Sequence, residues 1–115
     1  MMEEQPRIGR ITVAPQVLET IARLTTLAVP GVARLVPARG VRRIVRHDGV
    51  EIEVSGNSVR VELHIVTEPD VNMLNVSHQI QAEVTRAIQD MVGMEVQSVD
   101  VHIEDVAHAL ETARV

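Results

Sequence analysis

The 115 residues of the sequence include no cysteine, phenylalanine, tyrosine or tryptophan. Without cysteine, disulfide bonds and thiol catalysis are excluded, which fits a reducing compartment. Without aromatic rings the core must be aliphatic, and Phe, Tyr or Trp rings cannot stack on the bases of single-stranded nucleic acid. These absences argue against a cysteine enzyme and against a nucleic-acid reader of the stacking type.

Other absences concern targeting and catalysis. The N-terminal stretch MMEEQPR is acidic and precedes no apolar run, so the sequence predicts no signal peptide. The longest apolar stretches fall far short of the roughly 20 residues that span a bilayer. No Gly-rich phosphate loop, nucleophile elbow or HExxH motif is present. We therefore expect a cytoplasmic protein with no integral membrane segment. We also expect that it is not an enzyme, and we assign no catalytic residue or cofactor.

Lysine is missing as well, and the charge is unevenly distributed. All 11 cationic residues are arginine, and the net charge is −5. Residues 1–47 hold 8 Arg and 3 acidic residues, whereas residues 48–115 hold 3 Arg and 13 acidic residues. The densest basic segment contains Arg39, Arg42, Arg43 and Arg46. This basic segment is either a solvated loop or a contact for an anionic partner, which could be an acidic protein surface, lipid headgroups or RNA phosphate.

The longest periodic stretch runs from Val71 to Met94 and predicts an amphipathic helix. Its apolar residues recur every three or four positions and form one stripe: Met73, Val76, Ile80, Val84, Ala87, Ile88 and Met91. Asn72 is a suitable N-cap, and Gly93 can adopt the left-handed conformation that follows a last helical turn. A sheet must pack against this stripe.

A strand and a second helix are expected on the N-terminal side of this long helix. Residues 8–13 have the pattern of a short strand, and Pro15 suits the first position of a helix. Pro30 and Gly31 end this helix. Its predicted buried stripe comprises Val17, Leu18, Ile21, Leu24, Thr25 and Ala28.

Residues 31–36, 50–54 and 59–66 predict three strands, and 37–48 is a basic loop or a ragged strand. Ser55-Gly56-Asn57-Ser58 indicates a tight hairpin between the last two. A two-residue turn at Gly56-Asn57 sets the cross-strand pairs. The inward pairs are Val54 with Val59, Ile52 with Val61 and Val50 with Leu63, and the outward pairs are Glu53 with Arg60 and Glu51 with Glu62.

Residues 96–103 predict the last strand, with a bulge near Gln97-Ser98 where the apolar phase changes. The chain from Asp105 onward is expected to form a short helix, and residues 107–115 are assigned to the C-terminal tail. We predict an α+β fold, a two-layer sandwich with two helices on one face of a mostly antiparallel or mixed sheet of four to five strands. We expect residues 8–106 to form the domain and residues 1–7 to be a flexible N-terminus.

Acidic side chains concentrate on the outward positions of the predicted strands. The candidate partner-binding residues there are Glu51, Glu53, Glu62 and Glu104, with Asp100 beside them. His64 and His102 are also outward, and if their strands are neighbours they could join Glu62 and Glu104 in a cation site. The spacing contains no metal-binding motif, so we expect solvated histidines and assign no metal.

The chain resembles the alkaline shock protein family of envelope-stress proteins, also called the Gls type, over residues 8–106. The N-terminal half contributes Gly9-Arg10-Ile11-Thr12-Val13, Val17, Ile21-Ala22 and Pro30-Gly31-Val32, and the middle contributes Gly49-Val50. The most specific matches lie later in the chain: Asn72-Met73, Val76, Ile80-Gln81, Val84, Ala87-Ile88, Met91, Gly93, Val96 and Val99-Asp100-Val101. Glu68-Pro69-Asp70 replaces the Tyr-Gly common before the long helix, and Val92 replaces the usual Thr.

The resemblance implies a cytoplasmic, non-enzymatic protein of envelope homeostasis and stress. Such proteins can gather at the membrane through an anchoring partner, and the family has no agreed catalytic residues. We therefore expect self-association and protein partners. The alternative is a nucleic-acid-binding adaptor that uses the basic segment, which the net charge and the missing aromatic rings disfavour.

Overall fold

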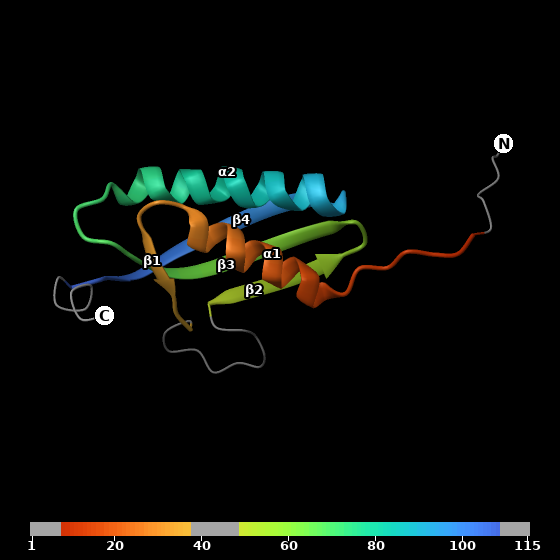
Figure 1. The fold of residues 1–115 in the computed structure, drawn as a ribbon, viewed down its shortest axis with the longest axis horizontal. Coiled ribbons are helices and arrows are strands. Elements are labelled where there is room, and N and C mark those ends of the chain that lie inside the picture. Colours follow the sequence, from red (N-terminus) through yellow and green to blue (C-terminus); the bar gives the residue numbers. More distant parts are fainter. Residues whose placement is uncertain (1–7, 38–48, 109–115) are drawn as a thin grey trace.

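The computed structural model describes residues 8–37 and 49–108, and it shows two helices against one face of a sheet (Figure 1). The elements are α1 (Pro15–Ala28), β1 (Val32–Leu35), β2 (Val50–Ser55), β3 (Ser58–Thr67), α2 (Met73–Val92) and β4 (Glu95–Val106). This is the predicted two-layer α+β arrangement.

β3 is the central strand of a mixed sheet. β4 runs parallel to β3 along its whole length, whereas β1 and β2 are antiparallel to it. β2 pairs with residues 58–63 of β3, and β1 pairs with residues 65–67. Because a strand has only two edges and β4 occupies one, β1 and β2 lie end to end along the other.

β3, α2 and β4 form a β-α-β unit whose lengths match. The 10 residues of β3 extend about 33 Å, and the 20 residues of α2 return the chain by about 30 Å. β4 therefore begins beside the start of β3, with Glu95 opposite Ser58. This parallel pairing decides which residues of the last strand reach the outer face.

The core lies between the helices and the inner face of the sheet. Its hydrophobic cluster is aliphatic, and Thr26 and Thr67 are also fully buried. From α2 the core takes Val76, Ile80, Val84 and Ile88, which belong to the predicted stripe. They pack with inward residues of the sheet, among them Val50, Val59, Val61, Leu63, Ile65 and Val99.

The predicted stripe of α2 is wrong for Met73 and Met91, which lie at the two ends of the helix and are 39% and 70% exposed. Asn72 caps α2 by accepting a hydrogen bond from the Asn75 amide on its Oδ1, and Gly93 ends it with a φ of 77°.

The predicted hairpin and bulge are both present. All five predicted pairs of the hairpin are observed, including Glu53 with Arg60 and Glu51 with Glu62. β4 shifts its register against β3 at Gln97, since Val59 pairs with Val96 but Arg60 pairs with Ser98. A second shift occurs at Glu104, between the pairs Ile65–Ile103 and Val66–Asp105.

The predicted strand over residues 8–13 is wrong. These residues form no strand, and Ile8 and Ile11 are 88% and 93% exposed. The segment, hereafter the N-terminal arm, projects from the start of α1 beyond the sheet (Figure 1). The arm leaves the start of α1 in the direction away from the sheet, so it does not run along a strand edge (Figure 1).

The predicted stripe of α1 is partly wrong. Leu18 and Ile21 are buried as expected, but the stripe continues through Ala22 and Thr26. Val17 and Leu24 are 43% and 56% exposed, because α1 turns a different arc toward the sheet and α2. The tail prediction is wrong at its start, since Asp105 and Val106 belong to β4, and residues 109–115 lie outside the described ranges.

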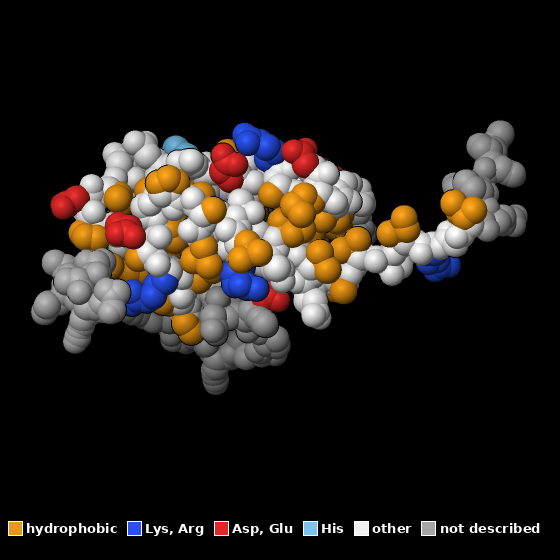
Figure 2. All heavy atoms as spheres, in the orientation of Figure 1, with side chains coloured by type: hydrophobic (Ala, Val, Ile, Leu, Met, Phe, Trp, Pro, Cys, Tyr) orange, Lys and Arg blue, Asp and Glu red, His pale blue; other side chains and the backbone are white. Residues whose placement is uncertain are grey.

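Hydrophobic side chains remain visible over the helix layer and the N-terminal arm (Figure 2). The large exposed residues along the arm and α1 are Ile8, Ile11, Val13, Val17, Leu24 and Leu27. α2 adds Met73, Leu74 and Met91. Neither described helix is long and apolar enough to cross a membrane.

Candidate functional site on the outer sheet face

The outer face of the sheet, opposite the helices, carries a straight row of three carboxylates. Glu62 of β3 pairs with Glu51 of β2 on one side and with Asp100 of β4 on the other. The three side chains therefore stand in one line across three strands, and we call this line the acidic row. The hairpin turn positions Glu51, and the bulge at Gln97 positions Asp100.

The two other predicted acidic residues lie away from this row. Glu53 faces Arg60, whose Nε–H donates to Oε1 of Gln97 at 3.2 Å. Glu104 lies further along β4, where it contacts His64. The structure thus brings Glu51 and Glu62 together and places Glu53 and Glu104 at either end of the same face.

Arg39, Arg42, Arg43 and Arg46 lie outside the described residues. The chain positions that flank this basic segment are nevertheless defined. The Val36 amide donates to the His64 carbonyl oxygen, and the His64 amide donates to the Gly49 carbonyl oxygen, both at 2.9 Å. Both ends of the segment therefore contact the sheet beside His64, which lies between the parts of β3 that pair with β1 and with β2.

The bulge at Gln97 also explains why two histidines meet. If the register of the Val59–Val96 pair continued unchanged along β3 and β4, Val101 would lie opposite His64. Because the bulge shifts the register by one residue, His102 lies opposite His64 instead. A slip of one residue moves every following side chain to the opposite face. The extra residue therefore brings His102 to the outer face, and the two imidazole rings stack at 4.6 Å between centroids.

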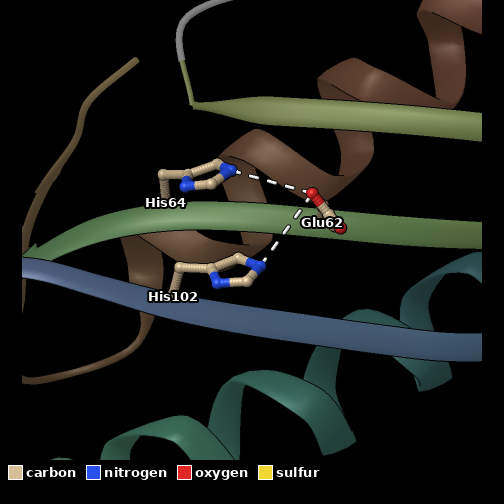
Figure 3. A group of neighbouring side chains, drawn as sticks. All are labelled: Glu62, His64 and His102. Atoms are coloured by element: carbon tan, nitrogen blue, oxygen red, sulfur yellow. Dashed lines mark ion pairs between the residues drawn. The ribbon is translucent and has the colours of Figure 1, made fainter. Parts of the chain in front are cut away.

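Glu62 completes a compact cluster with these two rings, drawn in Figure 3. Its Oε1 lies 3.8 Å from Nε2 of His64 and 3.9 Å from Nε2 of His102. One ligand atom from each of the three residues lies within 4.8 Å of the other two. The Glu62 and His102 side chains are 42% and 47% exposed, so the cluster opens to solvent on one side.

His64 is held more rigidly than the other two members. Its side chain is 9% exposed, and its Nδ1 lies 2.7 Å from Oε2 of Glu104. A protonated Nδ1 donates to that carboxylate and leaves Nε2 as the free acceptor of the neutral ring. Nε2 is buried and has no hydrogen-bond partner within residues 8–37 and 49–108.

The expectation of two solvated histidines is therefore wrong for His64, which is 7% exposed. The expectation overlooked that an outward position can be buried by neighbouring side chains such as the His102 ring. A signal was available in the sequence. Glu62-x-His64 and His102-x-Glu104 each place two metal-ligand side chains on one face of a strand.

A groove of about 860 Å³ follows the β2 edge of the sheet. It begins at Pro15 and Gln16 in the first turn of α1 and reaches Glu51, Glu62 and Asp100. The acidic row thus borders a surface depression and can be reached by side chains of another molecule.

The comparisons with known proteins point to one family. The model of the alkaline shock protein 23 family, described as having a cell envelope-related function, matches residues 3–108. The uncharacterized protein YqhY of Bacillus subtilis is 23% identical over 109 residues, which cover 90% of this chain and 81% of YqhY. An uncharacterized protein of Streptococcus pyogenes is 29% identical over 103 residues, which cover 86% of this chain and 80% of the relative.

Solved structures of the MamM CTD have a similar fold. A nickel form matches with a TM-score of 0.51 and 16% identity, covering 78% of this chain and 96% of that chain. A manganese form matches with a TM-score of 0.50 and 16% identity over the same shares. At this identity the likeness extends to the fold alone.

Proposed function

Because the chain belongs to the alkaline shock protein 23 family, whose function is cell envelope-related, we propose that it is a non-enzymatic stress-response protein acting through self-association and protein partners. The observation that carries this proposal is the acidic row, Glu51–Glu62–Asp100, on the sheet face that neither α1 nor α2 covers. The resemblance of the sequence to envelope-stress proteins adds support.

The acidic row is electrostatically unfavourable for an isolated domain. Like charges directly opposite each other on neighbouring strands destabilise a sheet, by up to about 1 kcal/mol for a pair. The row contains two such pairs, Glu51–Glu62 and Glu62–Asp100. A cationic partner that docks on the row removes this repulsion, and the groove at the β2 edge gives it access.

The chain itself carries a suitable cation source in the basic segment. Arg39, Arg42, Arg43 and Arg46 lie within eight residues, and both flanks of the segment meet the sheet beside His64. The basic segment of one copy docks on the acidic face of the next, formed by Glu51, Glu53, Glu62 and Glu104. Such a contact is heterologous and builds rings or filaments. A membrane-anchored protein with a basic segment would dock in the same way and bring the assembly to the envelope.

Sedimentation velocity across a salt series tests the proposal. We expect the wild-type protein to associate at low ionic strength and to dissociate as the Debye length shrinks from roughly 30 Å at 0.01 M to about 8 Å at 0.15 M salt. The double variant Arg42→Glu, Arg43→Glu should remain monomeric throughout. The acidic-face variant Glu51→Lys should also weaken association.

The matched control is Glu83→Lys, which changes the charge of α2 on the opposite side of the molecule by the same amount. It should associate like wild type. Sizes that are equal for all four proteins and independent of salt would contradict the proposal. Binding of the basic segment to the acidic face of its own copy would give a monomer at every salt concentration, and it too would contradict self-association.

A further inference from the structure

We propose that Glu62, His64 and His102 bind a divalent transition-metal ion such as Zn²⁺ on the outer face of the sheet. Two imidazole nitrogens and one carboxylate oxygen converge there from β3 and β4. This inference does not require self-association, because the ligand atoms all belong to a single copy.

The distances are close to those of a metal-bound site. A tetrahedral ion with ligands at about 2.0–2.1 Å holds its ligand atoms roughly 3.4 Å apart. In the cluster the Glu62 Oε1 atom lies 3.8 and 3.9 Å from the two Nε2 atoms. The His102 ring stacks on His64 with 11° between the ring planes, so it must leave that stack before both Nε2 lone pairs can point at one ion. The partial exposure of His102 and Glu62 leaves room for this rotation.

His64 is already prepared for this role. Nδ1 bonds to the Glu104 carboxylate at 2.7 Å, so the lone pair of the neutral ring is on Nε2, which points toward Glu62. This is the carboxylate–histidine–metal arrangement that orients metal-binding imidazoles. A metal ion at this position also accounts for the buried Nε2 atom of His64, which has no hydrogen-bond partner among the described residues. A bound ion would satisfy that atom.

The ligand set selects the class of ion. Imidazole nitrogen binds Zn²⁺, Ni²⁺ and Cu²⁺, whereas Mg²⁺ and Ca²⁺ prefer sites made of oxygen atoms. Three protein ligands leave one tetrahedral position open to water, on the solvent-exposed side of the cluster. The ion would also place positive charge at Glu62, the middle residue of the acidic row.

Isothermal titration calorimetry of the full chain with Zn²⁺ tests this site. We expect saturable binding of one ion per chain, at least tenfold tighter than the binding of Mg²⁺. His102→Ala and Glu62→Gln should each weaken Zn²⁺ binding at least tenfold. Both residues are partly exposed, so neither variant should disturb the fold. His78→Ala removes an exposed histidine of α2 and serves as the control, with unchanged binding.

Glu104→Gln tests the positioning of His64, because it weakens the hydrogen bond to Nδ1 and leaves every direct ligand in place. We expect a 10- to 100-fold loss of Zn²⁺ affinity. X-ray absorption at the zinc edge should show two imidazole ligands in wild type and one in His102→Ala. Zinc binding that survives both His102→Ala and Glu62→Gln, or no saturable binding in wild type, would overturn the proposal.

Discussion

Glu51 of β2 lies directly opposite Glu62 of β3, whereas the next outward pair along the hairpin, Glu53 with Arg60, has opposite charges. The register that creates this repulsion is set elsewhere. The two-residue turn and the buried aliphatic pairs, such as Val50 with Leu63, allow no other alignment. The aliphatic pairs outweigh a partly solvated charge pair.

This arrangement predicts opposite effects of one substitution at two neighbouring outward positions. Glu51→Lys converts a repulsive pair into an attractive one and should raise the free energy of unfolding by about 0.5 kcal/mol. Glu53→Lys converts the attractive pair with Arg60 into a repulsive one and should lower the free energy of unfolding by a similar amount. Urea denaturation measures both, and the difference should shrink at 1 M salt. Equal effects of the two variants would show that the cross-strand register does not control the electrostatics.

Gly31 and Gly93 both have positive φ, but they differ in their surroundings. At Gly31, with φ 103°, an added Cβ would lie 2.7 Å from Cγ2 of buried Val76, whereas at Gly93 it would meet no atom within 4 Å. Gly93→Ala should therefore cost only the backbone strain, about 1 kcal/mol. Gly31→Ala should cost clearly more, about 2–4 kcal/mol, because Val76 must also move. Thermal melts of both variants make the comparison, and equal losses would contradict the close approach of Gly31 to α2.

Local patterns were sufficient to predict much of the fold. The Gly56-Asn57 turn fixed the hairpin register, and the change of apolar phase located the bulge at Gln97. Asn72 and Gly93 marked the ends of α2. Each of these features depends on residues close together in the sequence, where side-chain periodicity and backbone preference act directly.

The candidate site depends on long-range pairing and could not be predicted in the same way. His64 and His102 meet only because α2 returns the chain to the start of β3, so that β4 pairs in parallel, and because Gln97 is an extra residue. The two histidines are neighbours only if β4 lies next to β3, and the sequence pattern alone does not determine the strand order. The missed phase of α1 has a similar cause, since Leu24 and Ala22 are both apolar and tertiary packing chooses between them.

Val84 provides a direct test of the core. It is fully buried on α2, and Val84→Asp places a carboxylate in an aliphatic environment without a cation. The expected loss of several kcal/mol is comparable to the whole free energy of unfolding of a small domain, so the variant should not fold cooperatively. Ala82→Asp, an exposed position of the same helix, is the control and should still melt cooperatively, with a loss of only about 0.5–1 kcal/mol from the lower helix propensity of Asp. A soluble, cooperatively melting Val84→Asp protein would mean that the wrong face of α2 has been assigned to the core.

The fold itself should not require a metal ion. The aliphatic core lies on the inner face of the sheet, whereas the Glu62–His64–His102 cluster lies on the outer face. Metal-free protein prepared with a chelator should keep its circular dichroism spectrum and melt cooperatively. Adding Zn²⁺ should then raise the melting temperature by several degrees, since ligand binding to the native state alone adds RT ln(1 + [L]/Kd). Loss of structure on chelation would instead make the metal part of the fold.

The N-terminal arm offers the last prediction. Ile11 has strand propensity but is 93% exposed, and the arm forms no strand in the described structure. Ile11→Ser should therefore leave the free energy of unfolding of the monomer unchanged within about 0.5 kcal/mol. Leu18→Ser, seven residues later in the buried face of α1, should cost at least about 2 kcal/mol. Both variants should be measured at low protein concentration, where association does not contribute. A large loss for Ile11→Ser would show that the arm packs as a strand, as its sequence pattern suggests.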